Sequence, residues 1–198
     1  MGRIWKRGRG KLGFLQPVLG TWVARSDGPM GPVRCTRRIA PVLGGSYFEL
    51  RALWEFGLSG NEAPGKVTAP GKRTSKSVKA VPAGVSAGNG VPDLALEFET
   101  RGGYKELALI GQDGNGEIAF WSFTSDGKRS QGKVCDVREV HEEAFGFEAQ
   151  MPAGLARMIY WPDGSEGFHW AAESRSARGW KRFVEHHYRP ASNPPKDA

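Results

Sequence analysis

The chain is a succession of short segments rich in aromatic and β-branched residues, each bounded by residues typical of tight turns. The connections include "QDGNG", "SDGK", "PDGSEG" and "SARG", which supply the Gly, Asn and Asp residues that tolerate positive φ. Helical periodicity is not sustained in any part of the sequence, and "FLQPVLG" is long enough for one short turn. This pattern predicts an all-β fold.

The segments that fit β-strands follow one another in simple succession. They are residues 19–26, 33–41, 46–56, 94–101, 104–112, 116–124, 130–139, 144–150, 155–161, 167–175 and 179–189. Strands joined mostly by tight hairpins form an antiparallel meander, and a meander removes its exposed edges by closing into a barrel. We therefore predict a single antiparallel up-and-down β-barrel of about ten strands.

The remaining segments have compositions that differ from those of the strands. Residues 57–93 contain no aromatic residue, are rich in Gly, Pro, Ser, Lys and Ala, and repeat "APGK", which predicts a disordered insertion loop. We also predict a basic flexible N-terminal segment over residues 1–14 and a disordered tail over residues 191–198. The barrel domain is expected to span residues 15–190.

The net charge of +7 is concentrated in these segments. Residues 1–16 contribute +5 and residues 60–82 contribute +4, which together exceed the net charge by two, so the rest of the chain is slightly acidic. Solvated Lys/Arg tracts attract polyanions weakly and without sequence preference. We therefore expect no specific nucleic-acid partner.

The N-terminus and the cysteines bear on the cellular location. The chain begins with basic residues, but Gly13, Gln16 and Pro17 interrupt the apolar part that a secretory signal would need, and no apolar run reaches the roughly 18 residues of a membrane-spanning helix. Cys35 and Cys135 are too few for a disulfide framework and are expected to be reduced thiols. These features predict a cytoplasmic protein without a membrane span.

Alternation along the strands assigns side chains to the two faces of the barrel wall. In 46–56 the apolar set contains Phe48 and Trp54, and in 167–175 it contains Trp170, so these side chains should point inward. Both faces of 116–124 are apolar, so alternation cannot separate Phe120 from Trp121. A barrel interior of this size can hold one small molecule, although the same rings could simply fill it as a core.

The consecutive His186 and His187 should lie on opposite faces of the last strand, which argues against a metal site made of both. His187 shares its face with charged residues, whereas His186 shares its face with Trp180, Val184 and Tyr188. His186 is therefore the interior candidate, either as a ligand contact or as a side chain held by Tyr188 or Arg182. The predicted pocket residues are Trp22, Phe48, Trp54, Phe120, Trp121, Trp170, Trp180, His186 and Tyr188.

The order of several motifs resembles a known family. "LGTW", "RRIAPVLGGSYFELRALWEF", "YKELALIGQDGNGEIAFWSFTSDG", "GFHW" and "GWKRFVEHHYRP" are similar to the bacterial lipocalin-like β-barrel (calycin-like) proteins of unknown function. A more distant resemblance is to nitrobindins, which are heme-binding barrels that open on Gly-x-Trp. The first resemblance implies a lipocalin-like barrel. The second implies heme as the cofactor, His186 as its axial ligand, and an action on nitric oxide or peroxynitrite.

The sequence offers no motif that argues for catalysis. "GNEAPGKV" lacks the hydroxyl residue of a phosphate-binding loop, and "HEEAF" lacks the second histidine of a zinc protease. A nucleophile-elbow serine and a Cys/His dyad spacing are also missing, so we assign no catalytic residue. We expect a non-enzymatic protein that binds a small hydrophobic or amphipathic molecule inside the barrel.

Overall fold

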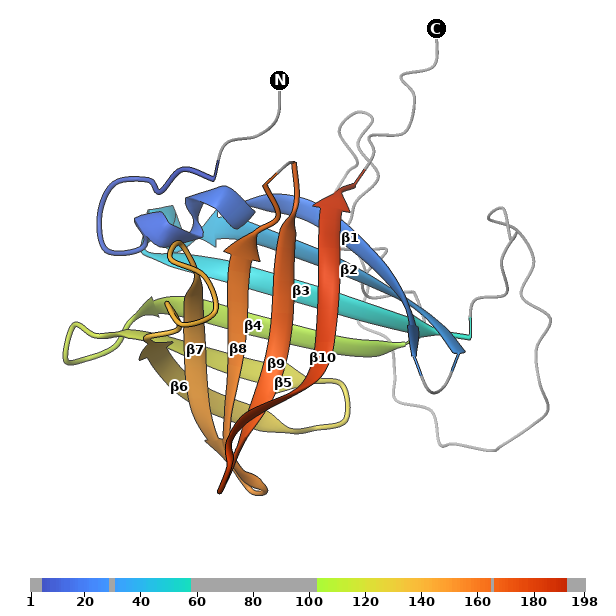
Figure 1. Ribbon diagram of the computed structural model, residues 1–198. Helices are drawn as coiled ribbons and strands as arrows, with labels where there is room; N and C mark the ends of the chain where they lie inside the picture. Colours follow the sequence, from blue (N-terminus) through green and yellow to red (C-terminus); the bar gives the residue numbers. More distant parts are fainter. Residues whose placement is uncertain (1–4, 29–30, 58–102, 165, 192–198) are drawn as a thin grey trace, which may run out of the picture. The chain divides into compact units, whose positions relative to one another are not determined.

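The computed structural model describes residues 5–28, 31–57, 103–164 and 166–191. These residues form a closed ten-stranded barrel in the order β1-β10-β9-β8-β7-β6-β5-β4-β3-β2, in which all neighbours are antiparallel (Figure 1). The strands are β1 (Gly20–Gly28), β2 (Gly31–Val42), β3 (Tyr47–Phe56), β4 (Tyr104–Gln112), β5 (Ile118–Thr124), β6 (Arg129–Cys135), β7 (Phe145–Met151), β8 (Gly154–Pro162), β9 (Phe168–Ser176) and β10 (Gly179–Pro190). The predicted all-β up-and-down barrel is confirmed.

Most strand bounds agree with the prediction to within about two residues, the usual uncertainty of such bounds. The predicted strand over 94–101, the insertion loop beyond Gly57 and the tail beyond Ala191 lie outside the described residues. The predicted strand 130–139 is too long, because β6 ends at Cys135. There Asp136 accepts a hydrogen bond from the backbone N–H of Arg138 and turns the chain, and Val137 is buried on the outside of the barrel.

Of the N-terminal segment predicted to be flexible over residues 1–14, Trp5 and Phe14 pack against the barrel, whereas residues 6–11 are exposed. The Trp5 ring stacks on Phe145 at 6.2 Å, and its Nε1 donates to the Glu143 carbonyl. The short turn predicted in "FLQPVLG" is a 3-10 helix, η1 (Gly13–Val18), which buries Leu15 and Val18 against the barrel core (Figure 1). The feature of the sequence that could have indicated these contacts is the presence of two aromatic residues, Trp5 and Phe14, in a segment that is otherwise basic.

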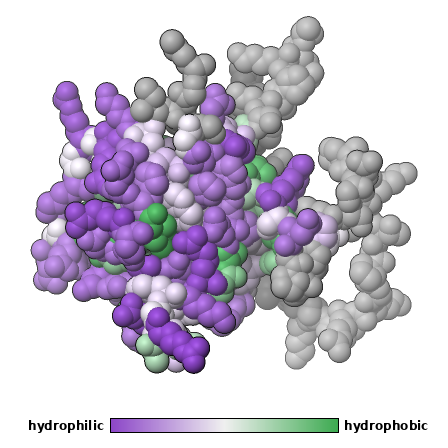
Figure 2. All heavy atoms as spheres, viewed as in Figure 1, coloured by the Kyte–Doolittle hydropathy of each residue, from purple (hydrophilic) through white to green (hydrophobic). Residues whose placement is uncertain are grey.

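The barrel wall separates an apolar interior from a polar exterior. Alternate side chains of the strands form the interior core, whose buried members include Ile39, Leu50 and Ile110. The face of the molecule seen in Figure 2 is mostly hydrophilic, with scattered apolar residues. Within the described ranges, no helix is long and apolar enough to cross a membrane.

Candidate ligand pocket inside the barrel

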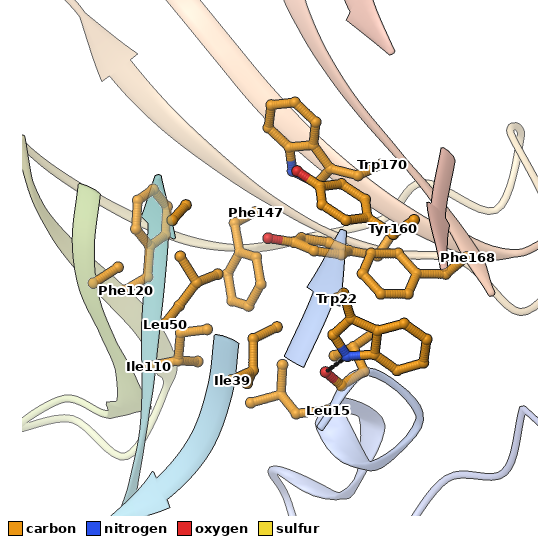
Figure 3. Close-up of a cluster of buried hydrophobic side chains, with 14 of the residues drawn as sticks. Leu15, Trp22, Ile39, Leu50, Ile110, Phe120, Phe147, Tyr160, Phe168 and Trp170 are labelled. Atoms are coloured by element: carbon orange, nitrogen blue, oxygen red, sulfur yellow. Dashed lines mark hydrogen bonds between the residues drawn. The ribbon is translucent and has the colours of Figure 1, made fainter. Parts of the chain in front are cut away.

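The two ends of the barrel interior are filled differently. At the end covered by η1, the side chains of Leu15, Trp22 and Phe168 are almost wholly buried and pack tightly (Figure 3). At the opposite end, where β3 ends and β4 begins, lies a cavity of about 400 Å³. The interior therefore combines both possibilities left open by the sequence, a packed core in one half and a pocket in the other.

The cavity wall is mainly apolar and comes from β3 to β10. Its lining includes aromatic, aliphatic and a few polar side chains, namely Trp54, Phe56, Tyr104, Glu106, Phe120, Ser122, Phe147, Met158, Trp170, Ala172 and Val184. Trp54, Phe120 and Trp170 are thus the predicted pocket residues that the structure places in the lining. An apolar cavity with few polar groups is the usual form of a small-molecule site.

Three other predicted residues point inward but lie away from the cavity. Trp22 and Phe48 belong to the packed end, where Trp22 is 1% exposed and its Nε1 donates to the Val18 carbonyl at 2.8 Å. Tyr188 is fully buried between the two halves, and its hydroxyl donates to Cys35 Sγ at 2.9 Å. None of the three residues lines the cavity.

Trp121 and Trp180, which we predicted to line the pocket, lie on the outer face. Trp121 alternates with the inward Phe120 and packs near Tyr47 at 6.3 Å. Trp180 contacts the Arg157 guanidinium at 4.1 Å. The prediction that Trp180 points inward is wrong because β10 has a β-bulge between Arg182 and Val184. The bulge reverses the faces of the β10 residues that precede it.

The histidine pair is split between the two faces, as alternation predicted. His186 is 5% exposed and lies inside, 5.7 Å from the Trp170 ring. His187 lies outside, stacked on His169 at 4.5 Å, with its Nε2 at 2.6 Å from Asp163 Oδ2. The predicted partners of His186 were Tyr188 and Arg182. The structure instead gives His186 Nδ1 no hydrogen bond, and Arg182 points outward to Glu173.

Arg37, which was not among the predicted pocket residues, is fully buried in the barrel interior, next to Trp54 and Trp170 of the cavity lining. Its Nη1 donates to Tyr160 Oη at 2.7 Å. The guanidinium lies among four aromatic rings, at 4.3 Å from Trp170 and between 5.3 and 5.8 Å from Tyr188, Tyr160 and Trp54. Aromatic faces stabilise a cation, but they accept no ordinary hydrogen bond from its remaining N–H groups.

A signal for Arg37 was present in the sequence but ambiguous. Arg37 alternates with Cys35 and Ile39, both of which are buried. The other face of the same strand, with Thr36, Arg38 and Ala40, is similarly mixed. Charge and hydropathy alone therefore could not show which arginine points inward.

The groups around Arg37 are neutral near pH 7. Burial raises the pKa of the Cys35 thiol to about 11 and that of Tyr160 to about 12, although the Arg37 charge acts in the opposite direction on both. Burial also raises the pKa of Tyr188 well above its usual value. None of these side chains therefore supplies a negative charge to balance the guanidinium.

Glu106 brings a carboxylate into the same interior, on the cavity wall. It accepts a hydrogen bond from Ser122 Oγ at 2.9 Å. In the strand register Ala52 lies between Arg37 and Glu106, and the described residues show no ion pair of Arg37 within 4.0 Å. The carboxylate does not contact the guanidinium, but its charge acts on it: burial lowers the pKa of Arg37, whereas neighbouring groups, Glu106 among them, raise it.

A heme bound through His186 does not fit this arrangement. The side chains that line the cavity do not include His186, whose ring lies beside Trp170 and Tyr188. An axial ligand has to face the space that receives the porphyrin, and here the imidazole and the cavity are separate. The structure therefore gives no support to the nitrobindin-like alternative.

His186 makes the stability of the protein depend on pH. Burial, together with the Arg37 charge, lowers the pKa of His186 from 6.5 to about 4. As the pH falls below 6.5 the unfolded chain binds this proton first, so stability falls until about pH 4 and is unaffected by His186 above pH 6.5. Between pH 7.5 and 5.0 we expect His186 to account for a loss of about 2 kcal/mol in the free energy of unfolding.

Chemical denaturation of the wild type and of His186→Gln at both pH values measures this contribution. The variant should lose less stability over the interval, because glutamine does not titrate. Equal losses in the two proteins would contradict the assignment.

Comparison with known proteins gives no relative for this chain, since neither a protein-family model nor a curated protein matches it. The function therefore has to be inferred from the geometry of the barrel interior.

Proposed function

We propose that this protein is a lipocalin-like barrel that binds one small hydrophobic or amphipathic molecule in its interior. The observation that carries the proposal is the cavity of about 400 Å³ with walls of aromatic and aliphatic side chains. Burying an apolar molecule there is favourable by roughly 25 cal/mol per Å² of apolar surface removed from water. The proposal assigns no chemical reaction to the protein.

The shape of the cavity supports reversible binding. Phe56 and Phe183 are among its lining residues, yet they are 45% and 63% exposed, so they connect the apolar wall to solvent. Exposed aromatic side chains that continue a cavity are typical of a ligand entrance. The packed half under η1 closes the other end.

A pocket-filling substitution tests the proposal. Ala172 lines the cavity, and Ala172→Trp should fill much of it. We expect the neutral fluorescent probe N-phenyl-1-naphthylamine to bind the wild type and to bind this variant roughly tenfold more weakly or worse, because less apolar surface can be buried. Fluorescence titration gives both affinities.

Ala40→Trp is the matched control. Ala40 lies on the outer face of β2, opposite Glu49 in the register, so a large side chain there should leave probe binding unchanged. The proposal would be refuted if the wild type bound neither this probe nor any molecule that can be extracted from the purified protein. Equal weakening in both variants would also count against it.

A further inference from the structure

Two nitrogens of Arg37, Nε and Nη2, make no hydrogen bond, although the residue is fully buried. A buried donor without an acceptor costs free energy, and such a group on a charged side chain costs more. His186 Nδ1, which lies nearby, also has no hydrogen bond, whereas the Trp170 indole N–H interacts with the Tyr160 hydroxyl. The three residues form a connected cluster, since Trp170 is 4.3 Å from the guanidinium and 5.7 Å from the His186 ring.

Other arginines of this barrel bind carboxylates through the edge of the guanidinium that carries Nε and Nη2. On the outer face, Arg34 donates from Nε to Glu55 Oε2 at 2.7 Å and from Nη2 to Oε1 at 2.9 Å. Arg51 uses the same two nitrogens on Glu49, at 2.7 and 3.2 Å. A guanidinium edge and a carboxylate match as a pair of parallel, charge-assisted hydrogen bonds. In Arg37 the same two nitrogens have no acceptor.

We propose that the ligand of this pocket is an amphipathic molecule with a carboxylate, which the Nε and Nη2 groups of Arg37 bind while the apolar part of the molecule occupies the cavity. This inference rests on the proposed function and adds the chemical class of the ligand. The Arg37 charge has no other ionic partner within 4.0 Å in the described interior, so a bound carboxylate would neutralise it.

Trp170 connects the cavity with the guanidinium, because its ring lines the cavity and also contacts Arg37. The carboxylate reaches Arg37 when this ring changes rotamer, a kind of adjustment that commonly accompanies binding. Glu106 opposes an anionic ligand from the cavity wall. Its hydrogen bond with Ser122 and its separation from Arg37 by Ala52 leave the guanidinium edge unblocked.

Competition against bound N-phenyl-1-naphthylamine tests the inference, with decanoate and its neutral analogue 1-decanol as the probes at pH 7.5. For the full-length wild type we expect decanoate to bind roughly tenfold or more tightly than decanol, as charge-assisted hydrogen bonds predict. Arg37→Met should weaken decanoate binding by about 10- to 100-fold and change decanol binding by less than about threefold. Arg37→Lys keeps the positive charge but loses the two parallel N–H donors. Its affinity for decanoate should therefore lie between those of the wild type and Arg37→Met.

Glu106→Gln separates the effect of charge from that of packing. Removing this carboxylate should strengthen decanoate binding by a larger factor than decanol binding, because only decanoate is repelled by its charge. Thermal unfolding of the wild type gives a measurement that does not depend on any variant folding. Decanoate should raise the midpoint more than decanol at equal concentration.

The outcomes distinguish the inference from the proposed function. Equal affinities of decanoate and decanol for the wild type, or equal losses of both in Arg37→Met, would overturn the carboxylate assignment while the pocket itself stands. Failure of the wild type to bind N-phenyl-1-naphthylamine, decanol and decanoate alike would overturn the proposed function. Retained probe binding in Arg37→Met shows that the variant is folded.

Discussion

Replacing Glu173 by alanine is expected to lower the free energy of unfolding by about 3–5 kcal/mol, the cost of leaving buried charges without their partner. The Glu173 side chain is 6% exposed and lies on the outer face between β8 and β10. It accepts hydrogen bonds from Arg157 at 2.8 Å and from two nitrogens of Arg182 at 3.0 Å. Without this carboxylate the two guanidiniums repel one another across a mostly buried site. Urea denaturation measures the loss.

Two further variants test whether the loss of charge pairing explains the lower stability of Glu173→Ala. Asp136→Asn removes an ion pair with Arg138 whose side chains are 60% and 74% exposed, and it should cost much less stability than Glu173→Ala. In Glu173→Ala, adding Arg157→Met should restore part of the lost stability, because it removes a buried guanidinium whose remaining partner is the mostly exposed Glu139. A double variant less stable than Glu173→Ala would show that packing, rather than charge, explains the loss.

The fold was largely predictable because its determinants are local. Each hairpin depends on residues within its own turn, as in "QDGNG", where Asp113 Oδ1 accepts the backbone N–H groups of Asn115 and Glu117. Alternation then assigned inward faces correctly on unbroken strands, as for Trp54 and Trp170, and for His186 in the part of β10 that follows the bulge. Alternation requires no knowledge of which strands are neighbours.

The site was less predictable because it depends on contacts between distant segments. The Arg182–Glu173 pair and the outward Trp180 follow from a bulge that only the pairing of β9 with β10 reveals. Arg37 and Tyr160 are 123 residues apart in the chain, and their hydrogen bond forms across the barrel interior. Burial of a charged side chain contradicts the hydropathy pattern, so a sequence-based prediction places it outside.

Replacing Trp22 by alanine is expected to destabilise the protein by about 3–5 kcal/mol, the usual cost of truncating a buried tryptophan. Trp22 is 1% exposed, lies 4.9 Å from the Phe168 ring and is close to Leu15 (Figure 3). The variant would leave a cavity in the packed half, and Val18 would lose the indole N–H that its carbonyl accepts. The free energy of unfolding from urea denaturation tests this expectation.

Trp121→Ala is the matched control, because Trp121 is only partly buried on the outer face, and truncating it should cost much less than truncating Trp22. Trp22→Phe keeps most of the apolar volume and should recover more than half of the loss. Trp22 lies away from the cavity lining, so the folded fraction of Trp22→Ala should bind N-phenyl-1-naphthylamine with the affinity of the wild type. If stability and affinity fell together, the packed half and the pocket would be one cooperative unit, and the division of the interior into a stabilising half and a binding half would be wrong.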